Sequence, residues 1–358
     1  MKKIKNYFWV IYLFLFLIIF LFLFIKISYL FRHITVNRKN IVGYYAEEEN
    51  TIDVVLIGGS STYVYWAPYE AWNAEGIVSY CFSADSMSPT LLKGMIEEAS
   101  KTQSPQLYII DLRALDVTEE HPGFYSEAYL RNITDSLKYS KVRNQMIKYS
   151  FNIEQPQLKY DIAKYIDFCM YHSLWQDLKE INYAYRNNDV VNENKGFHFT
   201  TDLFHEKLER RDYTDVEYEL PLSEQTNQIL IDLLDYCKDN DVRALFTLNP
   251  IYQDKSDTKA RYNYIERIVN EYGYEFLDTN EYYDEMGIDF TRDFYHRDHV
   301  NLYGAEKYTH FLANYIRNEY NISDRRQEEA YSSWYEGYDK WKAASDEHKK
   351  LIDENTVL

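Results

Sequence analysis

The pattern of apolar and polar positions predicts a membrane helix at the start of the chain. Residues 7–25 form an unbroken apolar run without a charged side chain. At a rise of about 1.5 Å per residue, a helix of this length covers roughly 29 Å, which matches the hydrocarbon core of a bilayer. The run is too long for the core of a cleaved signal peptide, and no small-x-small cleavage site follows it. We therefore expect a retained transmembrane anchor.

Beyond residue 51, short apolar segments alternate with amphipathic segments of helical period. Apolar runs rich in β-branched residues are typical of strands buried on both faces. Alternation of such strands with helices predicts a parallel sheet with right-handed crossovers. The expected fold class is therefore α/β, with a five-stranded parallel sheet. Strands are expected at 52–57, 77–82, 107–110, 242–248 and 274–277, and helices at 68–74, 89–102, 229–237, 259–272 and 302–320.

The remaining segments suggest how the chain is divided. Residues 117–220 are polar, rich in tyrosine and helical in character, which predicts an insertion after the third strand that shapes a cleft over the sheet's carboxyl edge. Residues 1–6 form a short N-terminal segment before the anchor, and residues 26–50 are assigned to a polar connector. The α/β domain is expected to cover 51–320. In the helical tail, 321–358, aromatic residues recur at helical spacing, which favours docking on the chain's own domain over a partner or glycan surface.

Composition narrows the function. The formal net charge is −18 at pH 7, and no compact basic patch follows the first 40 residues, so nucleic acid is excluded as a partner. Three widely spaced cysteines, Cys81, Cys169 and Cys237, give neither a disulfide framework nor a zinc spacing, and we expect buried free thiols. We expect no cofactor. Basic residues flank the apolar run on both sides, so charge leaves its orientation open.

Candidate chemistry lies at the end of the first expected strand. Gly58 and Gly59 allow a sharp turn there, with Ser60 at its tip. Open α/β sheets place reactive groups at the carboxyl ends of their strands, although this stretch alone fits an unreactive Gly-Ser turn as well. Just before the last expected helix, His299 lies on a loop that can reach the edge of the first strand. An imidazole there would accept the proton of Ser60 as a general base.

These two blocks carry a resemblance to the SGNH (GDSL-like) hydrolase superfamily. Gly58-Gly59-Ser60 matches the superfamily's G-x-S block, and His299-Val300-Asn301 followed by Gly304 matches its terminal H-x-N-x-x-G block. The chain looks most like membrane-anchored members from Gram-positive bacteria, which are related to cell-envelope O-acyltransferases and the teichoic-acid D-alanyl transfer protein. The similarity runs from about residue 52 to residue 315, interrupted by the insertion. It implies a flavodoxin-like three-layer fold, with Ser60 as nucleophile and His299 as base.

The acid of the superfamily's catalytic triad is missing from its usual place. It normally stands three residues before the histidine, where this chain has His296. Asp298 is adjacent to the histidine and is expected to point away, while Asp293 reaches it only if the loop folds back. His296, Asp298 and His299 also offer metal ligands, but their spacing is no recognised zinc pattern and we expect no metal. The sequence therefore fits a weakened triad, a Ser-His dyad or an inactive relative.

The groups that would stabilise an oxyanion are also altered. The superfamily's second block reads Cys81 to Ser86 here and lacks the glycine that donates its N–H, although another backbone N–H, such as that of Ser83, can serve. The N–H of Ser60 is the second expected donor. Arg113 and Asn249 follow the ends of strands and are candidates for the remaining polar role. A structural salt bridge for Arg113 and a turn before proline for Asn249 are the alternatives.

The resemblance implies a membrane-anchored serine esterase or O-acyltransferase that acts on cell-wall or capsular glycan. It places the N-terminus in the cytoplasm and the globular domain outside the cell. A transferase of this kind would receive its acyl group from a separate multi-span membrane protein, because one span cannot form a channel. The alternative is a catalytically inactive protein of the same fold that binds glycan or scaffolds a cell-wall or polysaccharide assembly complex. The altered acid and oxyanion positions favour that alternative.

Overall fold

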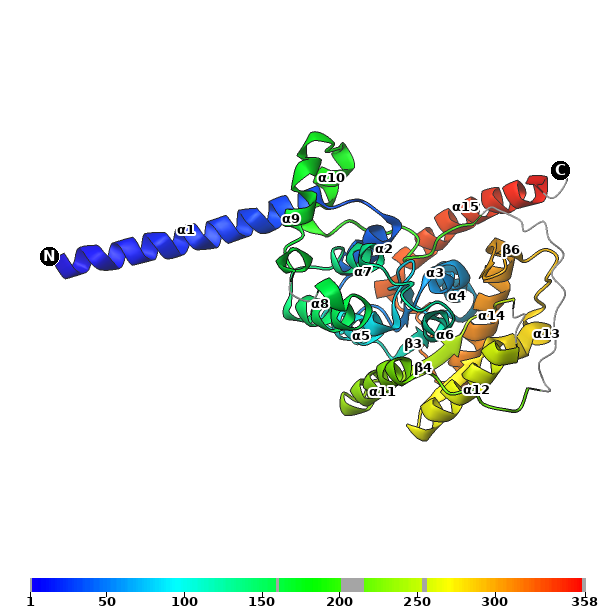
Figure 1. The fold of residues 1–358 in the computed structure, drawn as a ribbon. Coiled ribbons are helices and arrows are strands. Elements are labelled where there is room, and N and C mark those ends of the chain that lie inside the picture. Colours follow the sequence, from blue (N-terminus) through cyan, green and yellow to red (C-terminus); the bar gives the residue numbers. More distant parts are fainter. Residues whose placement is uncertain (1, 159–160, 201–215, 253–255, 356–358) are drawn as a thin grey trace.

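A five-stranded sheet whose strands are all parallel forms the centre of the protein (Figure 1). We describe it from a computed structural model, which defines residues 2–158, 161–200, 216–252 and 256–355. The strands follow the spatial order β2-β1-β3-β4-β5. Their residues are almost all buried, as expected for strands covered by helices on both faces. The strands are β1 (Val54–Ile57), β2 (Ser79–Cys81), β3 (Leu107–Asp111), β4 (Ala244–Leu248) and β5 (Glu275–Asp278).

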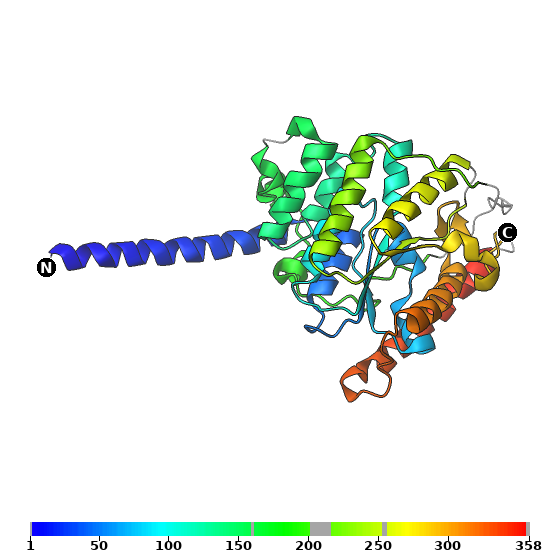
Figure 2. The same ribbon diagram turned by 90° about the horizontal axis from the view of Figure 1, so that it is seen from below.

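Helices cover both faces of this sheet, so the domain has three layers (Figure 2). One layer contains α3 (Ser60–Tyr65), α4 (Pro68–Glu75) and α14 (Leu302–Glu319). The opposite layer contains α5 (Leu92–Ala99), α11 (Glu224–Asp239) and α12 (Ser256–Glu271). All five expected strands and the expected helices are present, which confirms the predicted α/β class. The strand ends lie within two residues of the predicted bounds, because sequence patterns locate strand centres better than strand ends.

The insertion between β3 and β4 is helical, as predicted, but only its first part lies near the carboxyl edge of the sheet. It contains α6 (Arg113–Glu120), α7 (Glu127–Thr134), α8 (Lys141–Glu154), α9 (Phe168–Tyr171) and α10 (Glu180–Ala184). The part of 117–220 that the structure describes contains no strand; residues 159–160 and 201–215 lie outside it. Helices α9 and α10 contact the first helix of the chain instead of covering the sheet edge (Figure 1).

The segment predicted as a polar connector is part of the folded domain. Helix α1 (Lys2–Phe31) continues beyond the apolar run, and α2 (Val36–Tyr45) packs with most of its residues buried. The interpretation of residues 26–50 as a connector is therefore wrong. Several of its polar side chains face inward, among them the buried Arg38, which donates to the carbonyl oxygens of Tyr29 and Tyr185. The polar pattern does not distinguish such buried hydrogen-bonding groups from those of a linker.

Within α1, residues Phe8–Phe31 are long and apolar enough to cross a membrane. Side chains from Phe8 to Leu23 are exposed on all sides of the helix, and protein begins to cover it at Phe24. A helix that is apolar all round and bare of protein contacts suits a lipid environment.

The aromatic tail docks on its own domain, as predicted. It comprises a 3-10 turn, η7 (Glu329–Tyr331), and α15 (Ser333–Asn355), which packs against α4. Trp341 is only 1% exposed, and the ring of Trp334 lies 5.1 Å from that of Tyr69 and 5.6 Å from that of Trp72. The prediction for the cysteines is only partly right, because Cys81 and Cys237 are buried whereas Cys169 is exposed.

Candidate functional site

Ser60 lies where the sequence predicts it, at the carboxyl end of β1. It is the first residue of α3, and Gly59 is the N-cap. Glycine is required at position 58 for space: a Cβ there would lie 2.8 Å from Cβ of Asp111 and 2.3 Å from Oγ1 of Thr62. Neither Gly58 nor Gly59 has a positive φ, so the turn depends on the close approach of β1 to β3 and not on left-handed backbone.

His299 is carried by a short antiparallel hairpin where the sequence predicts a loop. Its strands are β6 (Phe294–His296) and β7 (His299–Val300), and it leads directly into α14. The pattern missed it because strands of three and two residues around a polar turn carry no readable alternation. The hairpin brings Nε2 of His299 to 2.7 Å from Oγ of Ser60. The predicted nucleophile and base therefore lie within hydrogen-bond distance.

The remaining residues of the H-x-N-x-x-G block, Asn301 and Gly304, have structural roles that hold this hairpin. Asn301 is the N-cap of α14, where its Oδ1 accepts hydrogen bonds from the N–H of Tyr303 at 3.0 Å and Gly304 at 3.4 Å. A Cβ on Gly304 would lie 2.6 Å from the carbonyl oxygen of Asp293, so glycine allows the helix to approach the hairpin. Histidine, asparagine and glycine at this spacing thus fix the imidazole at the start of a helix.

Among the residues that the structure describes, no carboxylate orients the imidazole, because Nδ1 of His299 is buried and has no hydrogen-bond partner there. Asp298 instead forms an ion pair with Arg113 at 2.7 Å, and Asp293 accepts hydrogen bonds from Lys307 and the N–H of Asp289, both at 2.7 Å. His296 occupies the place of the triad acid, and its ring centroid lies 4.9 Å from that of His299. However, Nδ1 of His296 accepts a hydrogen bond from the N–H of Asp298 at 3.1 Å. The arrangement is a Ser-His dyad.

The environment keeps the imidazole of His299 neutral. Burial, the positive charge of Arg113 and the neighbouring His296 together lower its pKa from 6.5 to about 3, with burial as the largest cause. A neutral imidazole can accept a proton from serine. The imidazolium that results lacks a carboxylate beside it, so the base is available but weak.

The dyad borders a pocket of about 420 Å³. Arg113 and Asp298 lie on its rim together with a mixed polar and aromatic wall. The wall includes Asp85, Ser86, Met87, Phe124, Tyr125, Ile251 and Tyr252. Because the lining combines apolar surface with a few polar groups beside Ser60, the pocket has the character of a small-molecule site.

Two predicted site residues do not line this pocket. Ser83 is fully buried, and its hydroxyl has no hydrogen-bond partner among the residues described. Asn249 lies below the dyad, where its Oδ1 accepts the hydroxyl of Tyr308 at 2.6 Å and its Nδ2 donates to Asp111 at 3.3 Å. The pattern located both at strand ends but could not show that their side chains face the core.

Arg113 does line the pocket, and its contacts show how it acts. The guanidinium donates to the carbonyl oxygen of Asp298 at 2.7 Å and pairs with the carboxylate of the same residue at 2.7 Å. Arg113 begins α6, directly beyond β3, so this pair ties the sheet edge to the turn of the hairpin that carries His299. The structural salt bridge, which was the alternative interpretation, is what the structure shows.

Asp111 is a buried carboxylate at the site whose role the sequence did not indicate. Its Oδ2 accepts the hydroxyl of Ser61 at 2.5 Å, and its Oδ1 accepts the N–H of Arg113 at 3.1 Å. Burial raises its pKa, while these hydrogen bonds oppose the rise. Asp111 thereby connects the start of α3, which carries the nucleophile, to the start of α6. A carboxylate at the end of a central strand was the available signal.

Backbone N–H groups at the start of α3 are the donors available for an oxyanion. Gly59 has no side chain to cap them, so the N–H of Ser60 is not taken by an N-cap side chain. The facing loop, Asp85 to Met87, is positioned from α2: the N–H of Asp85 donates to Oδ1 of Asn37 at 2.6 Å. Within this loop, Ser86 has a φ of 51°, a conformation that tightens the turn.

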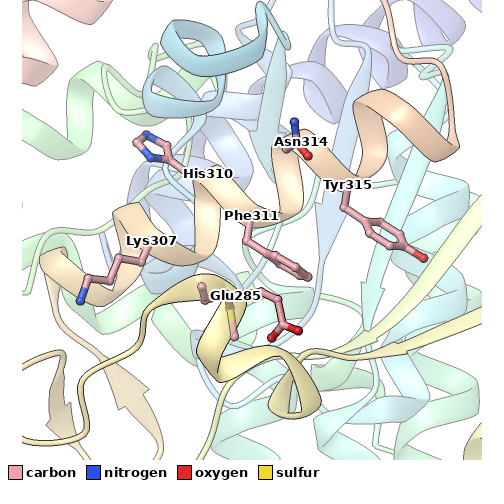
Figure 3. A pocket seen from close by; sticks show the side chains of 7 residues that line it. Glu285, Lys307, His310, Phe311, Asn314 and Tyr315 are labelled. Carbon is pink, nitrogen blue, oxygen red and sulfur yellow. The ribbon is translucent and has the colours of Figure 1, made fainter.

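A second hollow of about 510 Å³ lies between α13 (Tyr283–Met286) and α14 (Figure 3). Its polar groups take part in structural contacts: His310 bonds Glu70 at 2.6 Å, and Lys307 bonds the carboxylate of Asp293 at 2.7 Å. Ser60 and His299 do not line it. Within the described ranges, no three His, Cys, Asp or Glu side chains gather as a metal site.

Comparison with known proteins adds no information about function, so the function has to be inferred from the site itself. No protein-family model matches the chain, and no curated protein is significantly similar to it.

Proposed function

We propose that the protein is a membrane-anchored serine esterase or O-acyltransferase of the SGNH type. The observation that carries this proposal is the 2.7 Å contact between Oγ of Ser60 and Nε2 of His299 beside an open pocket. Two further features support it. The strand order β2-β1-β3-β4-β5 is the order of flavodoxin-like sheets, and the nucleophile lies at the carboxyl end of β1, next to the switch point of that order.

The geometry supports a two-step acyl transfer. Oγ of Ser60 attacks the carbonyl carbon of an ester while its proton moves to Nε2 of His299, and the N–H of Ser60 donates to the developing oxyanion. The imidazolium then protonates the leaving alkoxide, which gives an acyl-serine and an alcohol. Water completes hydrolysis, or a glycan hydroxyl completes transfer, by the reverse sequence with His299 again as base.

The missing carboxylate sets the expected rate. Replacing the triad acid by an amide costs a serine protease about 10⁴ in turnover, and a residual 10³–10⁴ over water survives from the oxyanion hole and binding. We therefore expect an enzyme that relies on the Ser60–His299 dyad to have a slow turnover. Such a turnover is sufficient for modifying long-lived polymers.

The substrate class and location follow from the resemblance together with helix α1. We propose that α1 anchors the chain with its N-terminus in the cytoplasm and its domain outside, where cell-wall or capsular glycan is the acyl-carrying or acyl-accepting substrate. In the transferase case, a separate multi-span membrane protein would supply the acyl group.

One observation favours a second function, a non-catalytic protein that binds glycan or scaffolds envelope assembly. Nδ1 of His299 is buried without a partner, and the pKa of that imidazole falls to about 3. The protonated form of a histidine in this environment is poorly stabilised, which hinders catalysis but does not matter if the pocket only binds a ligand.

Labelling with a fluorophosphonate probe separates the two functions. The full chain in detergent should form an adduct on Ser60, mapped by peptide mass, and Ser60→Ala and His299→Ala should each abolish it. Ser333→Ala, at an exposed serine of α15, is the matched control and should label like the parent protein. If the parent protein keeps its circular dichroism spectrum yet forms no adduct above a heat-denatured sample, the binding role replaces the enzyme.

A further inference from the structure

A collar of short helices around the end of α1 has no part in the proposed chemistry. We define the collar as residues 168–187, which form α9, the 3-10 turn η4 (His172–Gln176), α10 and the 3-10 turn η5 (Tyr185–Asn187). Figure 1 shows α9 and α10 beside the end of α1 that enters the domain. All four elements contact α1.

Specific contacts fix the level of the collar along α1. The ring of Phe168 lies 5.3 Å from that of Phe24 and 5.8 Å from that of Phe31. Nζ of Lys26 donates to Oδ1 of Asn187 at 2.7 Å. Further along, Nδ2 of Asn182 donates to the carbonyl oxygen of Arg32 at 3.3 Å. The collar therefore contacts α1 from the last apolar residues of the run to its end.

This level coincides with the expected membrane boundary. The bare part of α1, residues 8–23, is about 24 Å long, whereas a bilayer's hydrocarbon core is about 30 Å thick. The apolar run continues to Ile25, and Lys26 is the first charged residue after it. If the apolar run fills the hydrocarbon core, the edge of the collar at Phe24 reaches the layer where acyl chains meet headgroups.

The collar also exposes side chains that suit this layer. Trp175 is 62% exposed, and three other large apolar side chains, Met170, Ile181 and Tyr183, are 40–49% exposed. Trp and Tyr are enriched at membrane interfaces, and helices that lie in the interface insert their aromatic and aliphatic side chains there. The exposed charged residues of the collar are mixed in sign: Asp177, Lys179, Glu180 and Arg186. Attraction to anionic lipid therefore does not explain the surface, and apolar insertion does.

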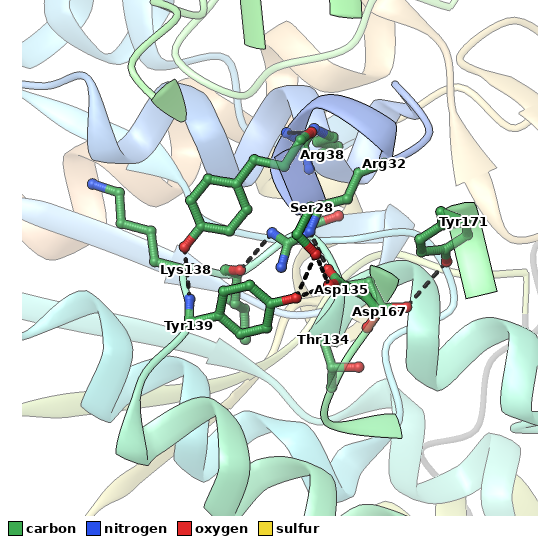
Figure 4. Close-up of polar contacts among 12 residues, drawn as sticks. Ser28, Arg32, Arg38, Thr134, Asp135, Lys138, Tyr139, Asp167 and Tyr171 are labelled. Atoms are coloured by element: carbon green, nitrogen blue, oxygen red, sulfur yellow. Dashed lines mark hydrogen bonds and ion pairs between the residues drawn. The ribbon is translucent and has the colours of Figure 1, made fainter. Parts of the chain in front are cut away.

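A buried charge cluster prevents the collar from swinging away from α1 (Figure 4). Asp167, directly before α9, forms an ion pair with Arg32 and accepts the hydroxyl of Ser28 at 2.6 Å. Asp135 accepts the hydroxyl of Tyr171, in α9, at 3.0 Å and pairs with Arg143 at 2.9 Å. Breaking such buried pairs leaves uncompensated charges, so the collar keeps one orientation relative to α1.

We propose that the collar is a membrane-contacting surface that inserts Trp175 and its apolar neighbours into the lipid interface around α1. This inference rests on the proposed anchoring by α1 but not on the proposed chemistry. The partner is the bilayer of the chain's own membrane, because the surface is continuous with the segment that spans it. The collar then holds the domain at one height and tilt above the lipid.

Depth-dependent quenching in vesicles tests this proposal on the full chain. The protein is reconstituted into phosphatidylcholine vesicles with or without nitroxide-labelled lipid, and an environment-sensitive dye is attached to single cysteines. Cys81 and Cys237 are buried, so Cys169→Ser removes the exposed thiol before Trp175→Cys is added. The native Cys169, itself in α9, serves as a second probe without any substitution.

Two control positions make the outcomes distinct. Ile18→Cys, in the bare part of α1, reports anchoring, and Leu351→Cys, on the exposed end of α15 opposite the N-terminus, reports solvent (Figure 1). We expect strong quenching at 18, at least threefold more quenching at 175 and 169 than at 351, and no loss in 0.5 M salt. Quenching at 18 without an excess at 175 and 169 overturns the collar proposal. Absence of quenching at 18 overturns the anchoring, and the collar proposal with it.

Discussion

Restoring a carboxylate beside His299 should accelerate the reaction of Ser60. His296 occupies the position from which an acid would act, because it pairs with His299 across the β6–β7 hairpin and the two rings lie 4.9 Å apart. Paired residues on one face of a hairpin have Cβ atoms about 5 Å apart, so an aspartate at 296 can reach the unpartnered Nδ1. His296→Asp therefore supplies the missing member of the triad.

The magnitude follows from the state of the imidazole. A pKa lowered from 6.5 to about 3 corresponds to roughly 5 kcal/mol against the imidazolium. A hydrogen bond to a charged partner returns about 1.5–3 kcal/mol, which is roughly a 10- to 150-fold rate increase. The same substitution removes His296, whose charge contributes to the low pKa. The pKa of His299 should therefore rise in the variant.

The rate of fluorophosphonate labelling at pH 7, measured on the full chain in detergent, is the assay. His296→Asn is the matched control, because asparagine has the shape of aspartate without its charge. This variant should be labelled at about the parental rate. Adding Ser60→Ala to His296→Asp should abolish labelling. Equal rates for His296→Asp and His296→Asn, with both proteins folded, would refute the argument that the missing carboxylate limits the dyad.

Two further predictions concern stability. The unfolded chain protonates His299 below pH 6.5, whereas the folded chain does so only near pH 3. The free energy of unfolding should therefore decrease as the pH is lowered from about 6.5 toward 3. Urea titration should show the parent protein losing about 3 kcal/mol more than His299→Gln between pH 7 and 4.5; equal losses would contradict a neutral buried imidazole. Asp167→Asn leaves Arg32 buried without its carboxylate and should cost about 3–5 kcal/mol. Adding Arg32→Leu should recover part of this loss in thermal unfolding, and a double variant no more stable than the single one would argue against an orphaned charge.

The sequence was sufficient to predict the sheet and the reactive pair. The β1 segment is a run of four buried apolar residues, so its strand character can be read directly from its pattern. Ser60 and His299 were predicted to meet because each adjoins an element that the pattern does show, β1 in one case and α14 in the other.

The parts that failed depend on side-chain direction and on pairing between distant segments. The side chain of Asn249, a candidate for a polar role at the site, faces the core, which position along the chain cannot show. Arg38 lies in the segment interpreted as a polar connector, but its partners lie at positions 29, 185 and 188, and only the folded chain brings them together. The position of the collar around α1 likewise arises from contacts across more than 130 residues.

Helix α2 and the residues just before it determine where the chain can be shortened without damage to the folded domain. Asn37 holds the pocket loop through Asp85, and Arg32 neutralises Asp167 in the interior. A soluble version that begins at residue 40, directly after the basic stretch, would remove both partners and leave a buried carboxylate and a loosened pocket rim. The folded unit thus starts inside the last turns of α1, before Ser28. Work in solution is best done on the whole chain in detergent or lipid, since the end of α1 packs into the same domain that carries Ser60 and His299.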